Sequence, residues 1–326
     1  MTYENLTAYL RACTTFENPL RVTGHPAPDT DAAVSALFEA WRLTQTGSPA
    51  LPLIQGTLSR ETAYLLGDIV FPDLPDGCGK WVLTDHHDTA AYEGEVVAIV
   101  DHHPVAEGVT FDGIDACIRP VGAATTLVAQ RIRENGFALD PACARILLGA
   151  ILLDTEGLSS RKAKEEDRDA AAWLSALCGE EVYAFYGVLQ EQLLSETDVD
   201  VLYERDYRAY TAADGSPLLG FAILKVRRGN LPDRDAVRRR LAEDAAAHGY
   251  AATVAKIALY GEDNRREEHY LAAGPAAAQV LTTVLTHSEG PAVRVAADEV
   301  FLPIDCYHHG RKRYALWLAE ALQQHL

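Results

Sequence analysis

Paired cysteines, long apolar runs and a basic amino terminus are all absent from this sequence, and each absence excludes a class of protein. The six cysteines form no Cys-x-x-Cys pair, so the sequence predicts neither a zinc knuckle nor a disulfide framework. No apolar run approaches the ~20 residues that a bilayer crossing requires, and the first 19 residues carry acidic side chains where a secretory signal has a basic start. We therefore expect a soluble cytoplasmic protein with no membrane span and with reduced cysteines.

Positive charge is scarce as well. Lys and Arg number 29 against 47 Asp and Glu, which gives a net charge of −18. Such a balance argues against a nucleic-acid or anionic-membrane surface, because those partners are bound by basic patches. A small anionic substrate would need local positive charge, supplied by metal ions or by clustered Arg and Lys.

The 326 residues are about twice the usual length of one domain, which favours two domains. In the first part, β-branched runs at 20–23, 50–55, 81–84 and 96–100 alternate with helical patterns, which is typical of a parallel sheet with crossover helices. A second alternation follows, and a helix at 314–324 ends the chain. We predict an α/β protein with a domain at 1–190, a linker at 191–214 and a smaller α/β domain at 215–326.

Four segments place acidic and imidazole side chains just after a predicted strand or on a buried helix. They are GHPAPDTD (24–31), TDHH (84–87), VDHH (100–103) and LLDT (152–155). Ligands of open α/β sheets bind outside the carboxyl ends of the strands, where three of these segments lie. We therefore expect one shared site.

The first segment offers His25, Asp29 and Asp31 within seven residues. Asp29 or Thr30 has a second interpretation, because either could simply cap the helix that follows. Capping does not account for His25. Both interpretations stay open at this point.

The other three segments strengthen the prediction of a metal site. Asp85 and the pair His102-His103 follow apolar runs that predict buried strands, and Asp154 ends the apolar stretch GAILL, where an unpaired carboxylate would be costly. Mixed carboxylate and imidazole ligands suit manganese, cobalt or iron better than magnesium. Two ions ~3.5–4 Å apart can activate a water for in-line phosphoryl displacement.

A basic run at 307–313 is the positive counterpart. It contains Arg311 and Lys312, and such side chains bind phosphate, Arg through two parallel hydrogen bonds and Lys as a point charge. Short basic runs are also common as solvated turns. The sequence does not decide between these two interpretations.

The order of these segments resembles the DHH phosphoesterase superfamily, and in particular the family II, manganese-dependent inorganic pyrophosphatases. The resemblance covers nearly the whole chain: GHPAPDTDAAVSA, GTLSRETAYLL, LTDHH, IVDHH, RPVGAATTL, GAILLDTEGL and GRKRYALWL appear in the family's order. It implies a parallel-sheet catalytic domain, a smaller associated domain, and an active site in the cleft between them. The implied activity is hydrolysis of pyrophosphate by a water that two metal ions activate.

The resemblance also implies a role for each site residue. One metal ion would bind His25, Asp29 and Asp85, and the other would bind Asp31, Asp85, His102 and Asp154. The bridging Asp85 and the substrate-facing His103 would be catalytic, while Arg311 and Lys312 would bind the phosphates. The implied cofactor is a pair of divalent ions, manganese with cobalt or magnesium as alternatives, and the implied assembly is a homodimer formed through edge strands.

Three departures keep other activities open. His86-His87-Asp88 stands where pyrophosphatases have His-Asn-Glu, the segment after Asp154 differs from the family's Lys-Ser-Pro-Thr, and Pro217-Leu218-Leu219 lies near an expected phosphate-binding Lys. The first alternative is an exopolyphosphatase or prune-like phosphohydrolase that acts on short polyphosphate. An oligoribonuclease or cyclic-dinucleotide phosphodiesterase is disfavoured because no Gly-Gly-Gly-His motif occurs, and a non-enzymatic regulatory protein is disfavoured because every ligand type is present.

Overall fold

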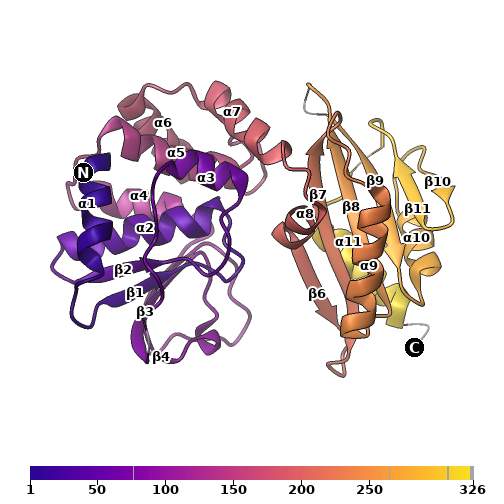
Figure 1. The fold of residues 1–326 in the computed structure, drawn as a ribbon, viewed down its shortest axis with the longest axis horizontal. Coiled ribbons are helices and arrows are strands. Elements are labelled where there is room, and N and C mark those ends of the chain that lie inside the picture. Colours follow the sequence, from indigo (N-terminus) through magenta and orange to yellow (C-terminus); the bar gives the residue numbers. More distant parts are fainter. Residues whose placement is uncertain (76, 264, 307, 324–326) are drawn as a thin grey trace. The chain divides into compact units, whose positions relative to one another are not determined.

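The chain divides into two α/β units, Met1–Gln192 and Leu193–Leu326 (Figure 1). A computed structural model describes residues 1–75, 77–263, 265–306 and 308–323. Within these ranges, none of the helices combines the length and the apolar character needed to cross a bilayer. The predicted α/β class with two units is confirmed.

The first unit is built on a five-stranded sheet in which every neighbouring pair is parallel. The strands run in the order β2-β1-β3-β4-β5. Their bounds are Leu20–Thr23 for β1, Ala50–Leu53 for β2, Gly79–Thr84 for β3, Gly94–Asp101 for β4 and Asp115–Ile118 for β5. The parallel sheet is therefore confirmed, with β5 added at one edge.

Seven α-helices and one 3₁₀ turn (η1, Thr89–Ala91) accompany this sheet in the described part of the unit. The helices are α1 (Tyr3–Cys13), α2 (Thr30–Gln45), α3 (Arg60–Leu66), α4 (Ala124–Glu134), α5 (Pro141–Asp154), α6 (Glu165–Cys178) and α7 (Val182–Leu194). Helix α2 packs on β1, β2 and β3 and also on α4 and α5. It is therefore buried over nearly its whole length, from Thr30 to Arg42.

Gly24 permits a tight passage from β1 into α2. A Cβ atom at Gly24 would lie 2.6 Å from the Cβ and 2.8 Å from the carbonyl oxygen of Ala32. Such distances are well inside van der Waals contact, so any larger residue would push the first turn of α2 away from the strand end. The glycine thus keeps the side chains on either side of it close together.

The second unit is built on a six-stranded sheet in the order β10-β11-β9-β8-β7-β6. Only β7 and β8 pair in parallel among these neighbours. The strands are β6 (Tyr207–Thr211), β7 (Pro217–Arg227), β8 (Ala252–Tyr260), β9 (Arg266–Ala273), β10 (Val293–Ala296) and β11 (Glu299–Leu302). Four helices accompany this sheet in the described part of the unit: α8 (Val199–Arg205), α9 (Arg234–His248), α10 (Ala277–Thr286) and α11 (Arg311–Gln323). Apolar side chains of α8 and α9 belong to one hydrophobic cluster with the strands, and those of α10 and α11 belong to a second cluster.

Two features of this unit differ from the predictions. The range 191–214, expected to be a linker, contains α8 and β6, and β6 pairs with β7. Helix α11 begins at Arg311 rather than 314, so Arg311 and Lys312 lie in its first turn. Tyr307 of the basic run and the predicted helix end at Gln324 lie outside the described residues.

A buried charged network lies between β8 and β9. Lys256 Nζ is 2.6 Å from Glu268 Oε1 and donates to the carbonyl oxygen of His309 at 3.0 Å. Arg266 Nε donates to the same Oε1 at 2.8 Å, and the Tyr270 hydroxyl donates to Oε2 at 2.8 Å. Glu268 is fully buried, so its charge depends on these partners for stabilisation.

Candidate metal centre

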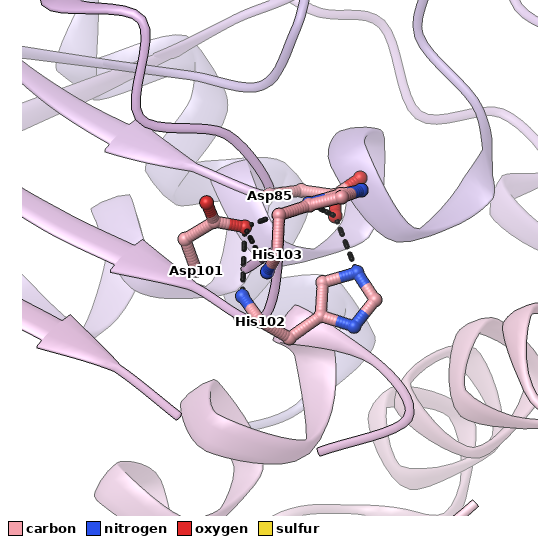
Figure 2. Close-up of side chains that lie close together, drawn as sticks. All are labelled: Asp85, Asp101, His102 and His103. Atoms are coloured by element: carbon pink, nitrogen blue, oxygen red, sulfur yellow. Dashed lines mark hydrogen bonds and ion pairs between the residues drawn. The ribbon is translucent and has the colours of Figure 1, made fainter. Parts of the chain in front are cut away.

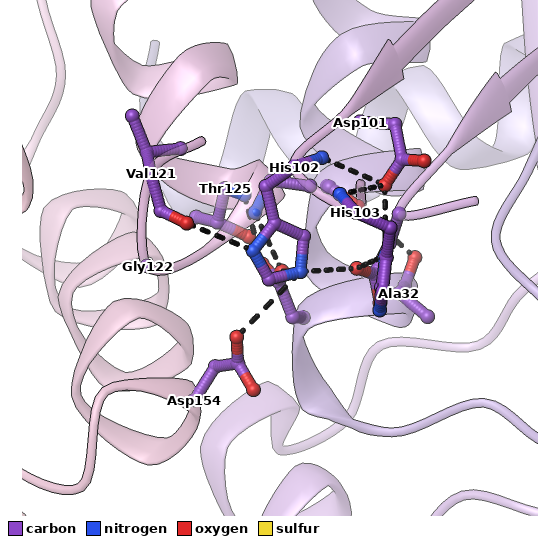
Figure 3. Close-up of polar contacts among 12 residues, drawn as sticks. Ala32, Asp101, His102, His103, Val121, Gly122, Thr125 and Asp154 are labelled. Carbon is purple, nitrogen blue, oxygen red and sulfur yellow. Dashed lines mark hydrogen bonds and ion pairs between the residues drawn. The ribbon is translucent and has the colours of Figure 1, made fainter. Parts of the chain in front are cut away.

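The carboxyl ends of three neighbouring strands bring the predicted site residues together. His25 comes just after β1, Asp85 just after β3, and His102 just after β4. Because these strands are adjacent and parallel, their ends meet at one edge of the sheet. Asp154, the last residue of α5, reaches the same place from the helical layer (Figure 3).

One group of possible metal ligands consists of His25, Asp29 and Asp85. His25 Nε2 lies 3.8 Å from Asp29 Oδ2 and 3.4 Å from Asp85 Oδ2. The other carboxylate oxygen of Asp29 caps α2 by accepting from Ala32 N at 3.0 Å. Asp29 therefore acts as a helix cap and contributes to the cluster at the same time.

A second group consists of Asp31, His102 and Asp154. His102 Nε2 lies 3.9 Å from Asp31 Oδ2 and 3.7 Å from Asp154 Oδ2. The backbone N–H groups of Ala124 and Thr125, in the first turn of α4, donate to the two oxygens of Asp31 at 2.6 and 2.8 Å. The helix end thus orients this buried carboxylate.

Asp85 stands between the two groups. Its Oδ1 lies 3.0 Å from His102 Nε2 (Figure 2). Its Oδ2 lies 3.4 Å from His25 Nε2. Its backbone φ of +61° is in the left-handed region, which is uncommon for a residue other than glycine. Such strain persists where the surrounding structure fixes it, and it is frequent at functional sites. Here it accompanies a carboxylate that points into the cluster.

The charges of the cluster shift the pKa values of its members. Burial would lower the pKa of His25, but hydrogen bonds with Asp29 and Asp85 raise it to about 10. Burial would also lower the pKa of His102, but Asp85 and the other carboxylates raise it to about 10. Burial and the Asp85 charge raise the pKa of Asp31 well above its usual range. Carboxylates this close together repel one another, and a divalent cation would relieve that repulsion.

The orientation of the His102 and His103 rings is set by the contacts of their Nδ1 atoms. The carbonyl oxygen of Val121 lies 3.1 Å from His102 Nδ1, which leaves Nε2 facing the carboxylates (Figure 3). Asp101 Oδ1 lies 2.9 Å from His103 Nδ1, so Nε2 of that half-exposed ring is free of this contact. Such backbone and carboxylate partners fix the tautomer of histidines that bind metals or move protons.

Asp101 holds two imidazoles and two backbone groups, and it lies in the predicted segment VDHH although it was not among the predicted ligands or catalytic residues. Its Oδ2 pairs with His87 Nδ1, and its Oδ1 accepts from the backbone N–H groups of His102 at 2.7 Å and His103 at 3.1 Å. Burial would raise the pKa of Asp101, but hydrogen bonds from His103 and His87 lower it. The position directly after the run VVAIV, like that of Asp85 after its strand, was the signal available.

His86 belongs to a separate polar contact behind the site. Its Nε2 lies 2.8 Å from the Tyr92 hydroxyl. Burial and the charge of His25 lower its pKa to about 4. At neutral pH the ring is therefore neutral, and it adds no positive charge beside His25.

A left-handed turn follows Asp154. Glu156, Gly157 and Leu158 have φ values of 51°, 65° and 66°. The buried Thr155 fixes this turn, because its hydroxyl donates to the Ile151 carbonyl oxygen at 2.6 Å and accepts from Leu158 N at 3.2 Å. Left-handed backbone costs about 1–2 kcal/mol for each residue other than glycine, of which packing of Leu158 against the core offsets a part.

The turn returns the chain toward Asp154, where Lys162 forms an ion pair. Lys162 Nζ donates to Asp154 Oδ1 at 2.9 Å. Burial would lower the pKa of Lys162, but the charge and hydrogen bond of Asp154 raise it. The lysine side chain is 56% exposed, and ion pairs at this exposure add at most about 1 kcal/mol to stability.

Arg311 and Lys312 belong to the second unit. Arg311 Nη1 donates to the backbone oxygen of Asp206 at 2.7 Å and also pairs with its carboxylate. Arg311 is thus held at the start of α11 by a residue just before β6. Arg311, Lys312 and Asp206 all lie in the second unit, whereas the predicted metal ligands and His103 lie in the first.

Comparison with known proteins identifies relatives of the chain. No protein-family model matches the sequence. A Deinococcus radiodurans protein named a probable manganese-dependent inorganic pyrophosphatase is 32% identical over 209 residues, which cover 60% of this chain and 66% of that protein. A manganese-dependent inorganic pyrophosphatase of Methanothrix thermoacetophila is 29% identical over 197 residues, or 56% and 63% of the two chains. The chain thus spans just under two thirds of the length of these curated relatives.

A solved structure shares the fold. A Methanococcus jannaschii protein, whose name refers it to family II of the inorganic pyrophosphatases, superposes with a TM-score of 0.68. The superposition covers 93% of this chain and all of that one, at 22% sequence identity. At this identity the likeness establishes the fold.

Proposed function

We propose that this chain, a homologue of the manganese-dependent inorganic pyrophosphatases, hydrolyses inorganic pyrophosphate to two phosphates. The observation that carries the proposal is the position of Asp85, whose two oxygens face His25 in one ligand group and His102 in the other. A carboxylate shared in this way suits two neighbouring divalent ions.

The donor set fits such ions. Asp154 Oδ2 is buried and accepts no hydrogen bond in the described structure. A buried carboxylate oxygen without a partner costs free energy, and a bound cation would be such a partner. In the proposed assignment, His25, Asp29 and Asp85 hold one ion, and Asp31, Asp85, His102 and Asp154 hold the other. Imidazole and carboxylate ligands together suit manganese or cobalt better than magnesium. Bound there, the ions would neutralise the charge of the phosphates and acidify a water.

The residues of the chain have the remaining tasks. The attack of water oxygen on one phosphorus breaks the bridging P–O bond, and the departing phosphate needs a proton. In its imidazolium form, with Nδ1–H bonded to Asp101, His103 can donate that proton from Nε2. Arg311 and Lys312 would bind phosphate oxygens. The net charge of −18 disfavours nucleic acid or an anionic membrane as the partner, because those are bound by extended basic surfaces, whereas a compact anion needs only local positive charge.

Metal removal tests this function most directly. We expect exhaustive chelation to abolish phosphate release and added Mn²⁺ or Co²⁺ to restore it, because the carboxylates alone cannot stabilise the charge of the reacting phosphates. The measurement is phosphate release from pyrophosphate, tripolyphosphate, long polyphosphate and a dinucleotide. Equal rates before and after chelation would contradict the metal centre, and a dominant rate on long polyphosphate would favour the exopolyphosphatase alternative.

Replacing Arg311 tests the basic run. We expect Arg311→Ala to raise KM for pyrophosphate about 10- to 100-fold, since a charge-assisted hydrogen bond is worth about 1.5–3 kcal/mol. Arg239→Ala is the matched control, because Arg239 is exposed on α9. An unchanged KM in Arg311→Ala, with the melting temperature unaltered, would show that Arg311 does not bind substrate.

A further inference from the structure

Lys162 is a cationic side chain in contact with the acidic cluster of the first unit. It forms an ion pair with Asp154, one of the carboxylates in the candidate ligand groups. Its partner atom is Asp154 Oδ1, at 2.9 Å. An ammonium group therefore stands at the rim of a site built from carboxylates and imidazoles.

The two oxygens of Asp154 face in different directions. Oδ2 is buried and lies 3.7 Å from His102 Nε2, within the group that also contains Asp31. Oδ1 meets the half-exposed side chain of Lys162. The carboxylate can therefore serve a cation through Oδ2 while Oδ1 keeps Lys162 beside it, so the two roles do not exclude each other.

A purely structural role does not account for this arrangement. An ion pair at this exposure adds little to stability, less than the cost of the left-handed residues Glu156 and Leu158 that bring the chain back to Asp154. Strain that local packing does not repay is often retained for function. The function that an ammonium group can serve next to a cation site is to bind an anion.

We propose that Lys162 is a substrate-binding residue that contacts a phosphate oxygen on the Asp31–His102–Asp154 side of the site. The inference rests on the proposed function for the identity of the substrate, and on the geometry of Asp154 for the position of the charge. Lys162 lies in the same unit as the candidate metal ligands. It offers the first unit a positive contact of its own, in a chain that lacks the Lys expected near 217–219.

The test compares Lys162→Met, Lys162→Arg and the control Lys164→Met, since Lys164 is exposed two residues away and the structure gives its side chain no ion pair. Three quantities are measured for each variant: KM and kcat for pyrophosphate, Kd for Mn²⁺, and Kd for inorganic phosphate on the manganese-loaded protein. Circular dichroism and melting temperature report on folding. Methionine keeps an unbranched side chain of similar length and removes the ammonium group.

We expect Lys162→Met to raise KM and the phosphate Kd at least tenfold, with kcat less affected. The Kd for Mn²⁺ should stay the same or fall, because removing a cation lessens repulsion of the ion. Lys162→Arg should keep both values near those of the wild type. Loss of the turn would weaken the binding of both phosphate and Mn²⁺, so weaker phosphate binding with unchanged or tighter Mn²⁺ binding distinguishes the two causes.

Two results would overturn the inference. In the first, Lys162→Met matches Lys164→Met in KM and in phosphate affinity. In the second, manganese affinity falls tenfold or more while KM rises, which would make Lys162 a support of the turn. If the wild type releases no phosphate from pyrophosphate, the proposed function fails, and the phosphate titration alone decides whether Lys162 binds anions.

Discussion

Asp85→Asn is expected to lower kcat for pyrophosphate by about 10³ or more. Asp85 faces both candidate ligand groups, so its replacement weakens both at once. The metal ions contribute several kcal/mol to stabilising the transition state, and each 1.36 kcal/mol is about tenfold in rate. Asn tolerates the left-handed backbone found at this position, so the fold should remain.

Phosphate release and manganese affinity, measured together, check this prediction. Asp112→Asn is a suitable control, because Asp112 is exposed in the loop before β5. The control should behave as the wild type in both assays. A variant Asp85→Asn that kept kcat within tenfold of the wild type would show that the two ligand groups do not depend on a shared carboxylate.

Glu268→Leu is expected to destabilise the second unit by about 3–5 kcal/mol, because it leaves the buried Lys256 without its carboxylate partner. The control Glu267→Leu changes the neighbouring residue, which pairs with Arg228 nearer the surface, and should alter stability by no more than about 1 kcal/mol. Urea denaturation, with hydrogen exchange at β8 and β9 as the local probe, measures both effects.

The double variant Lys256→Met/Glu268→Leu separates a lost ion pair from a stranded charge. Replacing both partners by apolar side chains should recover much of the stability, since the cost of Glu268→Leu comes largely from the uncompensated ammonium group. If the double variant is as unstable as the sum of the two single variants, Lys256 and Glu268 are not coupled.

The same pair predicts a dependence of stability on pH. Burial would raise the pKa of Glu268, but the charge of Lys256 and hydrogen bonds from His308 and other partners hold it well below its usual range. A carboxylate with a lowered folded-state pKa stabilises the fold above its unfolded pKa, and that contribution is lost as the pH falls toward the folded value. The difference in stability between the wild type and Glu268→Leu should therefore narrow below about pH 4.5.

The sequence predicts the part of the fold that rests on repeating patterns. Strand β1 has the bounds expected from its apolar run, and α2 begins at Thr30, directly after the cap Asp29. The parallel arrangement follows from strands alternating with helices, and it accounts for the convergence of residues from three strand ends.

Other features depend on contacts between distant residues. The ion pair between Lys162 and Asp154 requires a left-handed turn whose residues, apart from Gly157, give no local signal of that conformation. Strand β5 lacks an apolar run because it is an edge strand with exposed residues. The contact of Asp101 with His87 arises only once β3 and β4 lie side by side.

The edges of the first sheet differ in their availability to another chain. At β2, the backbone N–H of Ala50 donates to the Thr44 hydroxyl, its carbonyl oxygen accepts from the Tyr9 hydroxyl, and Pro52 has no N–H to offer. Strand β5, at the opposite edge, has Asp115 and Ala116 exposed. Side chains of α1 and α2 therefore close one margin of the sheet to strand addition. Assembly of two copies through this sheet would have to proceed along β5.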